Sequence, residues 1–152
     1  MSIVTEFCRR RSLGGLVALG LLTALAATAD AAATVVKATL WDKSDGTQGI
    51  ELSQDKVKAG KITFLVTNKS MTQQEHEFLV VKTDLNPDQL PFTQAGARVD
   101  EDKLGQVNEI GDLEPGHSKK GTFALTPGKY LLFCNEEGHV KAGMITRFTV
   151  EP

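Results

Sequence analysis

Apolar and polar residues alternate with a period of two along most of the chain beyond residue 33. At the start of this region Val36, Ala38 and Leu40 alternate with Lys37 and Thr39. Similar alternation recurs in five later segments, at residues 62–67, 76–80, 123–125, 130–134 and 146–150. A period of two places every second side chain on the same face of an extended strand, so the pattern indicates half-buried β-strands.

Turn-forming residues separate these runs. Clusters that contain glycine, proline, asparagine or serine lie at residues 45–46, 59–61, 68–70, 115–116 and 126–129. About seven short strands joined by such turns are typical of an all-β sandwich. We therefore predict one β-sandwich with a single hydrophobic core for residues 32–152.

Residues 83–113 depart from this pattern. The segment contains two prolines, three glycines and several acidic residues, and it is longer than an ordinary hairpin loop. We expect a long loop with a short helix at residues 88–95 or 101–107. One interpretation of its role is a lid over one end of the sandwich.

The first residues have the form of an export signal. Three arginines at residues 9–11 precede an apolar run at residues 13–29, which ends in small residues that fit an A-x-A cleavage site. The run is shorter than the roughly 20 residues of a membrane span. We predict a signal peptide at residues 1–31, of the twin-arginine or general type, and a periplasmic mature protein that does not span a membrane. An uncleaved membrane anchor is the alternative.

Composition narrows the function classes. The chain has 152 residues, 41% hydrophobic and 24% charged, and a formal net charge of −2. This charge argues against a nucleic-acid partner, because no basic excess is present to neutralise phosphates. The two cysteines are too few for a disulfide scaffold, and only Cys134 lies beyond the predicted signal.

Three possible metal donors lie at even spacing near the C-terminus. Cys134, His139 and Met144 form the pattern C-x4-H-x4-M between two apolar runs, so one tight loop can present a thiolate, an imidazole and a thioether. Gly138 and Gly143 precede the last two donors and allow sharp backbone turns there.

A second imidazole, His76, begins an alternating strand and shares a face with Phe78 and Val80, so we expect it to point inward. Two histidines, one cysteine and a weak methionine are the donor set of a blue copper electron-transfer site. We therefore predict that one copper ion, cycling between Cu(I) and Cu(II), binds to His76, Cys134, His139 and Met144. Taken singly, Cys134, His76 and Met144 are each better explained by core packing or a turn, and their joint occurrence is what points to copper.

The segments 127–150 and 68–81 resemble the cupredoxins, the plastocyanin and azurin family of type 1 copper proteins. The resemblance implies a Greek-key sandwich of about eight strands, with His76, Cys134 and His139 as equatorial ligands and Met144 as the axial one. It also implies a small monomeric electron carrier that serves redox proteins such as a cytochrome or a copper or haem enzyme. His139 would lie nearest to solvent, within an apolar docking patch.

Two further expectations concern the surroundings of the thiolate. Phe133 is expected to shield it, and a backbone N–H from Asn135 or a neighbour is expected to donate a hydrogen bond to the Cys134 sulfur. With three histidines in all, the sequence offers no second metal site for chemistry on a substrate. We therefore do not expect an enzyme.

Other residues have plainer interpretations. His117 follows a Pro-Gly turn and is expected to be exposed, and Met71 is expected to be loop filler or a cover for the copper. Glu136 and Glu137 form either a solvated rim or a docking patch for a basic partner. Two interpretations of Tyr130 are open: a corner tyrosine whose hydroxyl bonds the backbone near the turn, or a residue that packs in the core. We assign Trp41 to the core.

Two rival functions remain open at this point. The same ligands would suit a periplasmic protein that stores or delivers Cu(I) without cycling, and Met71 would then matter more. A copper-free sandwich that only binds a partner would leave the donor pattern as coincidence.

Overall fold

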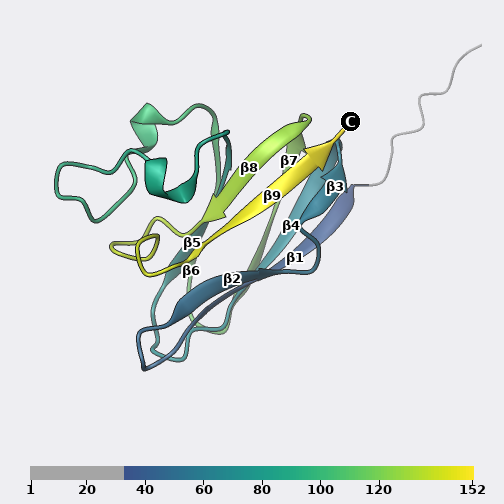
Figure 1. Cartoon of the computed structure of the whole chain (residues 1–152). Coiled ribbons are helices and arrows are strands. Elements are labelled where there is room, and N and C mark those ends of the chain that lie inside the picture. Colours follow the sequence, from purple (N-terminus) through teal and green to yellow (C-terminus); the bar gives the residue numbers. More distant parts are fainter. Residues whose placement is uncertain (1–32) are drawn as a thin grey trace, which may run out of the picture. The chain divides into compact units, whose positions relative to one another are not determined.

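Nine strands in the described part of the chain form two sheets that pack face to face (Figure 1). The structure is a computed structural model that describes residues 33–152, so the predicted signal peptide lies outside the described residues. The strands are β1 (Thr34–Asp42), β2 (Gln48–Leu52), β3 (Lys56–Lys58), β4 (Gly60–Asn68), β5 (His76–Lys82), β6 (Val107–Leu113), β7 (Ser118–Leu125), β8 (Gly128–Phe133) and β9 (Ile145–Glu151).

The two sheets contain four and five strands. Their orders are β2-β1-β4-β7 and β3-β9-β8-β5-β6. β1 pairs with β4 in parallel, β3 pairs with β9 in parallel, and the other pairs are antiparallel. The predicted all-β sandwich is therefore confirmed. β3 escaped prediction because it has three residues, of which only Val57 is buried, and a strand this short shows no periodicity.

The main core lies between the sheets and follows the alternation in the sequence. Val36, Ala38 and Leu40 of β1 are at most 1% exposed. Phe64 of β4 meets Phe78 of β5 and Phe148 of β9, with ring centroids 5.3 and 5.5 Å apart. These rings join the two sheets in one hydrophobic core.

A second apolar cluster lies on the outer face of the five-stranded sheet. Leu79 and Val81 of β5 and Leu131 and Phe133 of β8 point to this face, and all four are buried. They are covered chiefly by Leu90, Phe92, Val99 and Leu104 from residues 83–106, which we call the covering segment (Figure 1). The expected lid over the end of the sandwich is therefore wrong. β5 and β8 are apolar on both faces. The covering segment keeps their outer face out of contact with water.

The predicted helices are shorter than expected. The covering segment contains two single turns of 3₁₀-helix, η1 (Pro87–Gln89) and η2 (Glu101–Lys103). Residues 107–113, which we assigned to the loop, instead form β6. This edge strand buries only Ile110 and Leu113, and its register with β5 shifts between His76 and Phe78, so it lacks the alternation that marks the other strands.

The structure tests the two interpretations of Tyr130 and the assignment of Trp41 to the core. The Tyr130 hydroxyl donates a hydrogen bond to the Thr126 carbonyl at 2.8 Å, and Tyr130 is also 4% exposed, so both interpretations of this residue hold. The assignment of Trp41 to the core is wrong. It is partly exposed and lies opposite Gly49 of β2, where a β-carbon would come within 2.9 Å of the indole.

Within residues 33–152, no helix is long and apolar enough to cross a membrane.

Asn68 is a buried polar residue at the end of β4. Its Nδ2 donates hydrogen bonds to the carbonyls of Gln74 and Leu113 at 2.8 and 2.7 Å, and its Oδ1 accepts one from the Ser70 N–H at 2.8 Å. These bonds fix the loop that leads into His76 and tie it to the end of β6.

We expect Asn68→Ala to lower the free energy of unfolding by about 2–3 kcal/mol, because it leaves the buried Leu113 carbonyl and the part-buried Gln74 carbonyl without this donor. Urea denaturation measures this loss. Thr63→Val is the control, since it removes an exposed hydroxyl pair with Thr122 and should cost less than about 1 kcal/mol. Equal losses in the two variants would contradict the role given to Asn68.

Candidate metal centre

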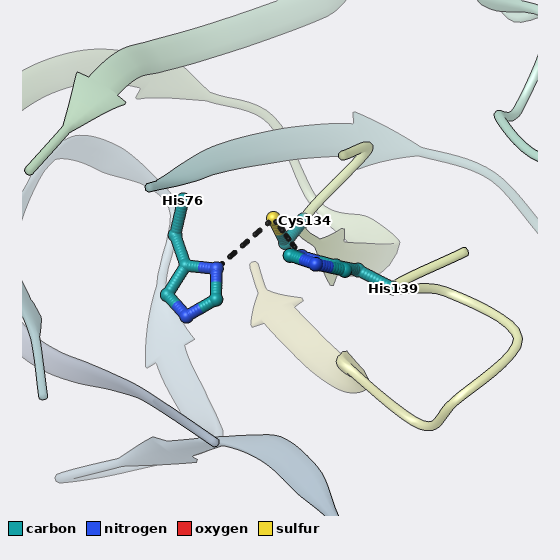
Figure 2. A group of neighbouring side chains, drawn as sticks. All are labelled: His76, Cys134 and His139. Atoms are coloured by element: carbon teal, nitrogen blue, oxygen red, sulfur yellow. Dashed lines mark hydrogen bonds between the residues drawn. The ribbon is translucent and has the colours of Figure 1, made fainter. Parts of the chain in front are cut away.

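Three predicted ligands converge at one end of the sandwich (Figure 2). The Cys134 sulfur lies 3.3 Å from His139 Nδ1 and 3.8 Å from His76 Nδ1. The donor atoms of the three residues all lie within 4.8 Å of one another. Both imidazoles therefore turn the same nitrogen toward the same sulfur.

Two adjoining inner strands of the five-stranded sheet place two of these donors. His76 is the first residue of β5, and Cys134 directly follows β8, its antiparallel neighbour. Both residues are fully buried, and His76 shares the inward face with Phe78 and Val80 as predicted. The Cys134 sulfur accepts a hydrogen bond from the Glu77 N–H at 3.4 Å, which links the ends of the two strands.

The third donor comes from residues 134–144, which we call the ligand loop. The loop closes on itself, because the Cys134 N–H donates to the Met144 carbonyl at 3.1 Å and the Met144 N–H donates to the His139 carbonyl at 2.9 Å. Gly138 and Gly143 have φ values of 83° and 103°, in the left-handed region that favours glycine. The turns predicted before His139 and Met144 are therefore confirmed.

Met144 lies in the same core as the cysteine. Its side chain is fully buried in the main hydrophobic cluster together with Cys134. Its backbone contacts with Cys134 and His139 keep it beside the other donors. Its role as an axial ligand stays a prediction.

Asp42 is a residue of this site that the sequence reasoning missed. This carboxylate ends β1 and is 4% exposed, and its Oδ2 lies 3.0 Å from His76 Nε2. Its Oδ1 accepts hydrogen bonds from the Thr72 N–H and hydroxyl at 3.1 and 2.5 Å. A signal was present, because Asp42 continues the inward-facing series of Val36, Ala38 and Leu40.

The electrostatics of the site favour neutral imidazoles. Burial lowers the pKa of His76, although the hydrogen bond and charge of Asp42 partly oppose this shift. Burial, followed by the nearby His76, lowers the pKa of His139. A neutral imidazole is the form that binds a metal ion.

The cysteine behaves differently. Burial raises the pKa of Cys134 to about 12, although backbone hydrogen bonds from Glu77 and Glu136 oppose the shift. At neutral pH the thiol therefore keeps its proton, and a metal ion must displace that proton to bind the sulfur.

One of two expectations about the surroundings of the sulfur is met, and the other needs correction. The sulfur accepts backbone hydrogen bonds from Glu77 and from Glu136, the neighbour of Asn135. Phe133 does not shield the sulfur, because the side chains of residues 133 and 134 point to opposite faces of the five-stranded sheet. Phe133 packs in the outer cluster under Val99, and Cys134 packs in the main core.

The covering segment is attached directly to the ligand loop. Asn135 is 2% exposed, and its side chain accepts from the Val99 N–H at 2.7 Å and donates to the Val99 carbonyl at 3.0 Å. The Gly138 N–H donates to the Ala97 carbonyl at 2.9 Å. Arg98 pairs with Glu136 at 2.5 Å. The first half of the loop is therefore held from outside the sandwich.

The surface beside His139 is polar. This imidazole is partly exposed, and the residues that line the neighbouring hollows are Asp42, Lys43, Gly46, Gln48, Thr72, Gln74, Glu75, Glu136, Glu137, Gly138 and Ala142. Most residues that line these hollows are polar or charged, and the apolar docking patch expected around His139 stays a prediction. Glu137 is exposed, whereas Glu136 is partly buried against Arg98.

Two of the remaining residues singled out in the sequence are exposed. His117 is exposed in a turn where its N–H donates to the Glu114 carbonyl, as predicted. Met71 is 71% exposed, which fits loop filler.

Glu77 is a partly buried carboxyl group beside the site. Its Oε1 has no hydrogen-bond partner within the described residues, and the nearest cation is the Arg98 Nη1 at 3.8 Å. Burial raises the pKa of Glu77 to about 7, and the negative charges of Glu136 and Glu109 add to the shift.

This shift predicts a pH-dependent stability of the metal-free protein. Between pH 4.5 and 7 the unfolded chain loses this proton while the folded chain keeps it, so the free energy of unfolding falls as pH rises. By pH 8 the loss reaches about 3 kcal/mol.

We expect Glu77→Gln to gain stability over the unchanged protein as pH rises. The difference in the free energy of unfolding between the two proteins should be about 3 kcal/mol larger at pH 8 than at pH 4. Urea denaturation at both pH values measures the change. A difference that does not vary with pH would show that Glu77 has the same pKa in the folded and the unfolded protein.

The fold matches solved structures of cupredoxins. Auracyanin from the photosynthetic bacterium Roseiflexus castenholzii, in its dithionite-reduced form, is 23% identical over 78% of this chain and 97% of that chain, with a TM-score of 0.53. Auracyanin B is 19% identical over 76% of this chain and 88% of that chain, also with a TM-score of 0.53. Rusticyanin from Thiobacillus ferrooxidans is 18% identical over 77% of this chain and 76% of that chain, with a TM-score of 0.51.

No protein-family model matches the sequence, and no curated protein matches it. At these identities the likeness to auracyanin and rusticyanin establishes the fold. The cupredoxin sandwich expected from the ligand motif is therefore confirmed, together with a cluster of His76, Cys134 and His139 at one end of it.

Proposed function

We propose that this protein is a small blue copper protein that transfers single electrons. His76, Cys134 and His139 would hold one copper ion, with Met144 as a weaker fourth donor. The observation that supports this proposal is the convergence of two Nδ1 atoms on one buried sulfur at the end of a cupredoxin sandwich.

The spacing of the donors fits a single metal ion. Bonds of about 2.3 Å to sulfur and about 2.0 Å to nitrogen, the lengths found at zinc sites, would separate S and N by about 3.7 Å at a trigonal angle. The observed separations of 3.3 and 3.8 Å lie on either side of this value. One thiolate, two imidazoles and a thioether are also the soft and borderline donors that copper prefers.

Copper would supply a one-electron Cu(I)/Cu(II) couple. The chain keeps the donors in place during electron transfer. His76 and Cys134 are anchored to paired strands, and the ligand loop is held by the covering segment. A site whose donors cannot move far needs little rearrangement when the electron arrives.

His139 is the ligand through which we propose the electron passes, because His76 and Cys134 are fully buried while His139 is partly exposed. Glu75 and Glu137 flank the hollow beside it. These charges favour a redox partner, such as a cytochrome or a copper or haem enzyme, with a basic rim around its own cofactor. The proposal includes export to the periplasm by residues 1–31 and a monomeric mature protein.

We expect Cys134→Ser to abolish the intense visible absorption of the Cu(II)-loaded protein, because a hydroxyl cannot give the sulfur-to-copper charge transfer. Absorption and electron spin resonance spectra measure this loss. His117→Ala is the control, since this histidine is exposed and is not a member of the donor cluster, so its loss should leave both spectra unchanged.

A Cys134→Ser variant that stays blue would remove the thiolate from the site. An unaltered protein that stays colourless and takes up only Cu(I) would support the rival function in Cu(I) storage or delivery, and one that binds neither ion would overturn the copper proposal.

We expect Met144→Leu to keep the copper but to raise its reduction potential. Leucine fills the buried space without offering a sulfur, so the oxidised ion loses more stabilisation than the reduced ion. Redox titration of the visible band measures the potential. A large loss of copper affinity, or a lower potential, would contradict the weak axial role.

A further inference from the structure

We propose that Asp42 is a positioning residue of the metal centre: it holds His76 in the tautomer that offers Nδ1 to the metal, and its negative charge favours the oxidised ion. This inference rests on the proposed function, because it concerns the same site. It differs from that function in naming a residue that does not touch the metal.

Asp42 reaches His76 from the other sheet. Asp42 is the last residue of β1 in the four-stranded sheet, and His76 is the first residue of β5 in the five-stranded sheet. The contact between Oδ2 and Nε2, at 3.0 Å, is buried at both ends, with side chains 5% and 0% exposed. It therefore crosses between the sheets beside the donors.

The hydrogen bonds around Asp42 determine its role. Its Oδ1 accepts both the N–H and the hydroxyl of Thr72, and its Oδ2 is the oxygen that faces His76. An ionised carboxylate only accepts hydrogen bonds, so His76 Nε2 must carry a proton. A neutral imidazole has one N–H, which leaves Nδ1 with a free lone pair, and Nδ1 is the atom that faces the Cys134 sulfur.

Asp42 also fixes the approach to His76. Its backbone carbonyl accepts the Met71 N–H at 3.3 Å, and its side chain binds Thr72. Both partners lie in the loop that leads into β5. One residue thus sets the position of the ring and the tautomer of the ring.

The charge of Asp42 has a further effect on a bound metal. A carboxylate that accepts from a metal-bound histidine makes that histidine a stronger donor. The stronger donor and the nearby negative charge stabilise the ion of higher charge, which is Cu(II). Among the described residues, the ring of His139 has no carboxylate within ion-pair distance, so the two histidines are not equivalent.

The first test uses the metal-free protein and needs no copper. Long-range proton–nitrogen NMR correlations report which nitrogen of His76 is protonated. We expect Nε2–H in the unaltered protein. A His76 protonated on Nδ1 would overturn the proposal without any variant, whether or not copper binds.

Asp42→Asn gives a sharper expectation. Because Thr72 donates twice to Oδ1, the amide oxygen of an asparagine should take that position and turn its NH2 group toward Nε2. Nε2 must then accept, so we expect His76 to switch to the Nδ1–H tautomer. An unchanged tautomer in the folded variant would contradict the positioning role.

The second test uses the copper-loaded protein. Outer partners of metal ligands typically change affinity by 10–100-fold, so we expect Asp42→Asn to shift the balance toward Cu(I) by at least tenfold, which is about 59 mV for a one-electron couple. Glu51→Gln is the control, because it removes an exposed negative charge from the hollow that Asp42 also lines.

The outcomes separate the two proposals. Equal potentials in Asp42→Asn and Glu51→Gln would overturn the role of the Asp42 charge while the blue copper function stands. An unaltered protein without a thiolate-to-copper band would overturn the function, and the NMR measurement would still decide the tautomer.

Discussion

The pairing of β5 with β8 is the interaction on which the rest of the structure depends. These two strands are the only pair in the described chain that places a histidine and a cysteine at adjoining ends in the interior. Each strand is apolar on both faces, so each face must be covered. The four-stranded sheet covers one face, and residues 83–106 cover the other. The sandwich and its outer layer thus both follow from burying one pair of strands.

The same burial sets the chemical character of the site. Removing the imidazoles and the thiol from water disfavours their charged forms, which leaves two neutral histidines and a protonated cysteine. Asp42 is the exception among the buried groups. Burial raises its pKa, but hydrogen bonds from Ser70, Thr72 and His76 outweigh that effect and hold the pKa below its usual value. The site therefore contains one fixed negative charge before any metal binds.

Much of this arrangement could be predicted from the sequence, for reasons that individual residues make clear. Strands with one face in the core show a period of two, so β1 and β4 were recognisable. The donors in the ligand loop are close in the sequence, and their spacing was visible as C-x4-H-x4-M. His76 could be added because it occupies the inward-facing position of an alternating strand.

The features that escaped prediction depend on contacts between distant residues. β6 is an edge strand with two buried side chains, so its sequence looks like that of a loop. Asp42 lies 34 residues before His76, and although it continues the inward-facing series of β1, nothing local shows which residue it would meet. The covering segment lies where it does because the outer face of β5 and β8 is apolar. No pattern within residues 83–106 carries that information.

The attachments between the covering segment and the ligand loop have a consequence for how this protein can vary. Asn135 binds the main chain of Val99 through both of its polar groups, and Gly138 binds the main chain of Ala97. A main-chain partner is present whatever side chain the residue bears. The support of the loop therefore constrains the length and path of residues 83–106 more than their identities, and related chains could keep it after the sequence similarity in this region has been lost.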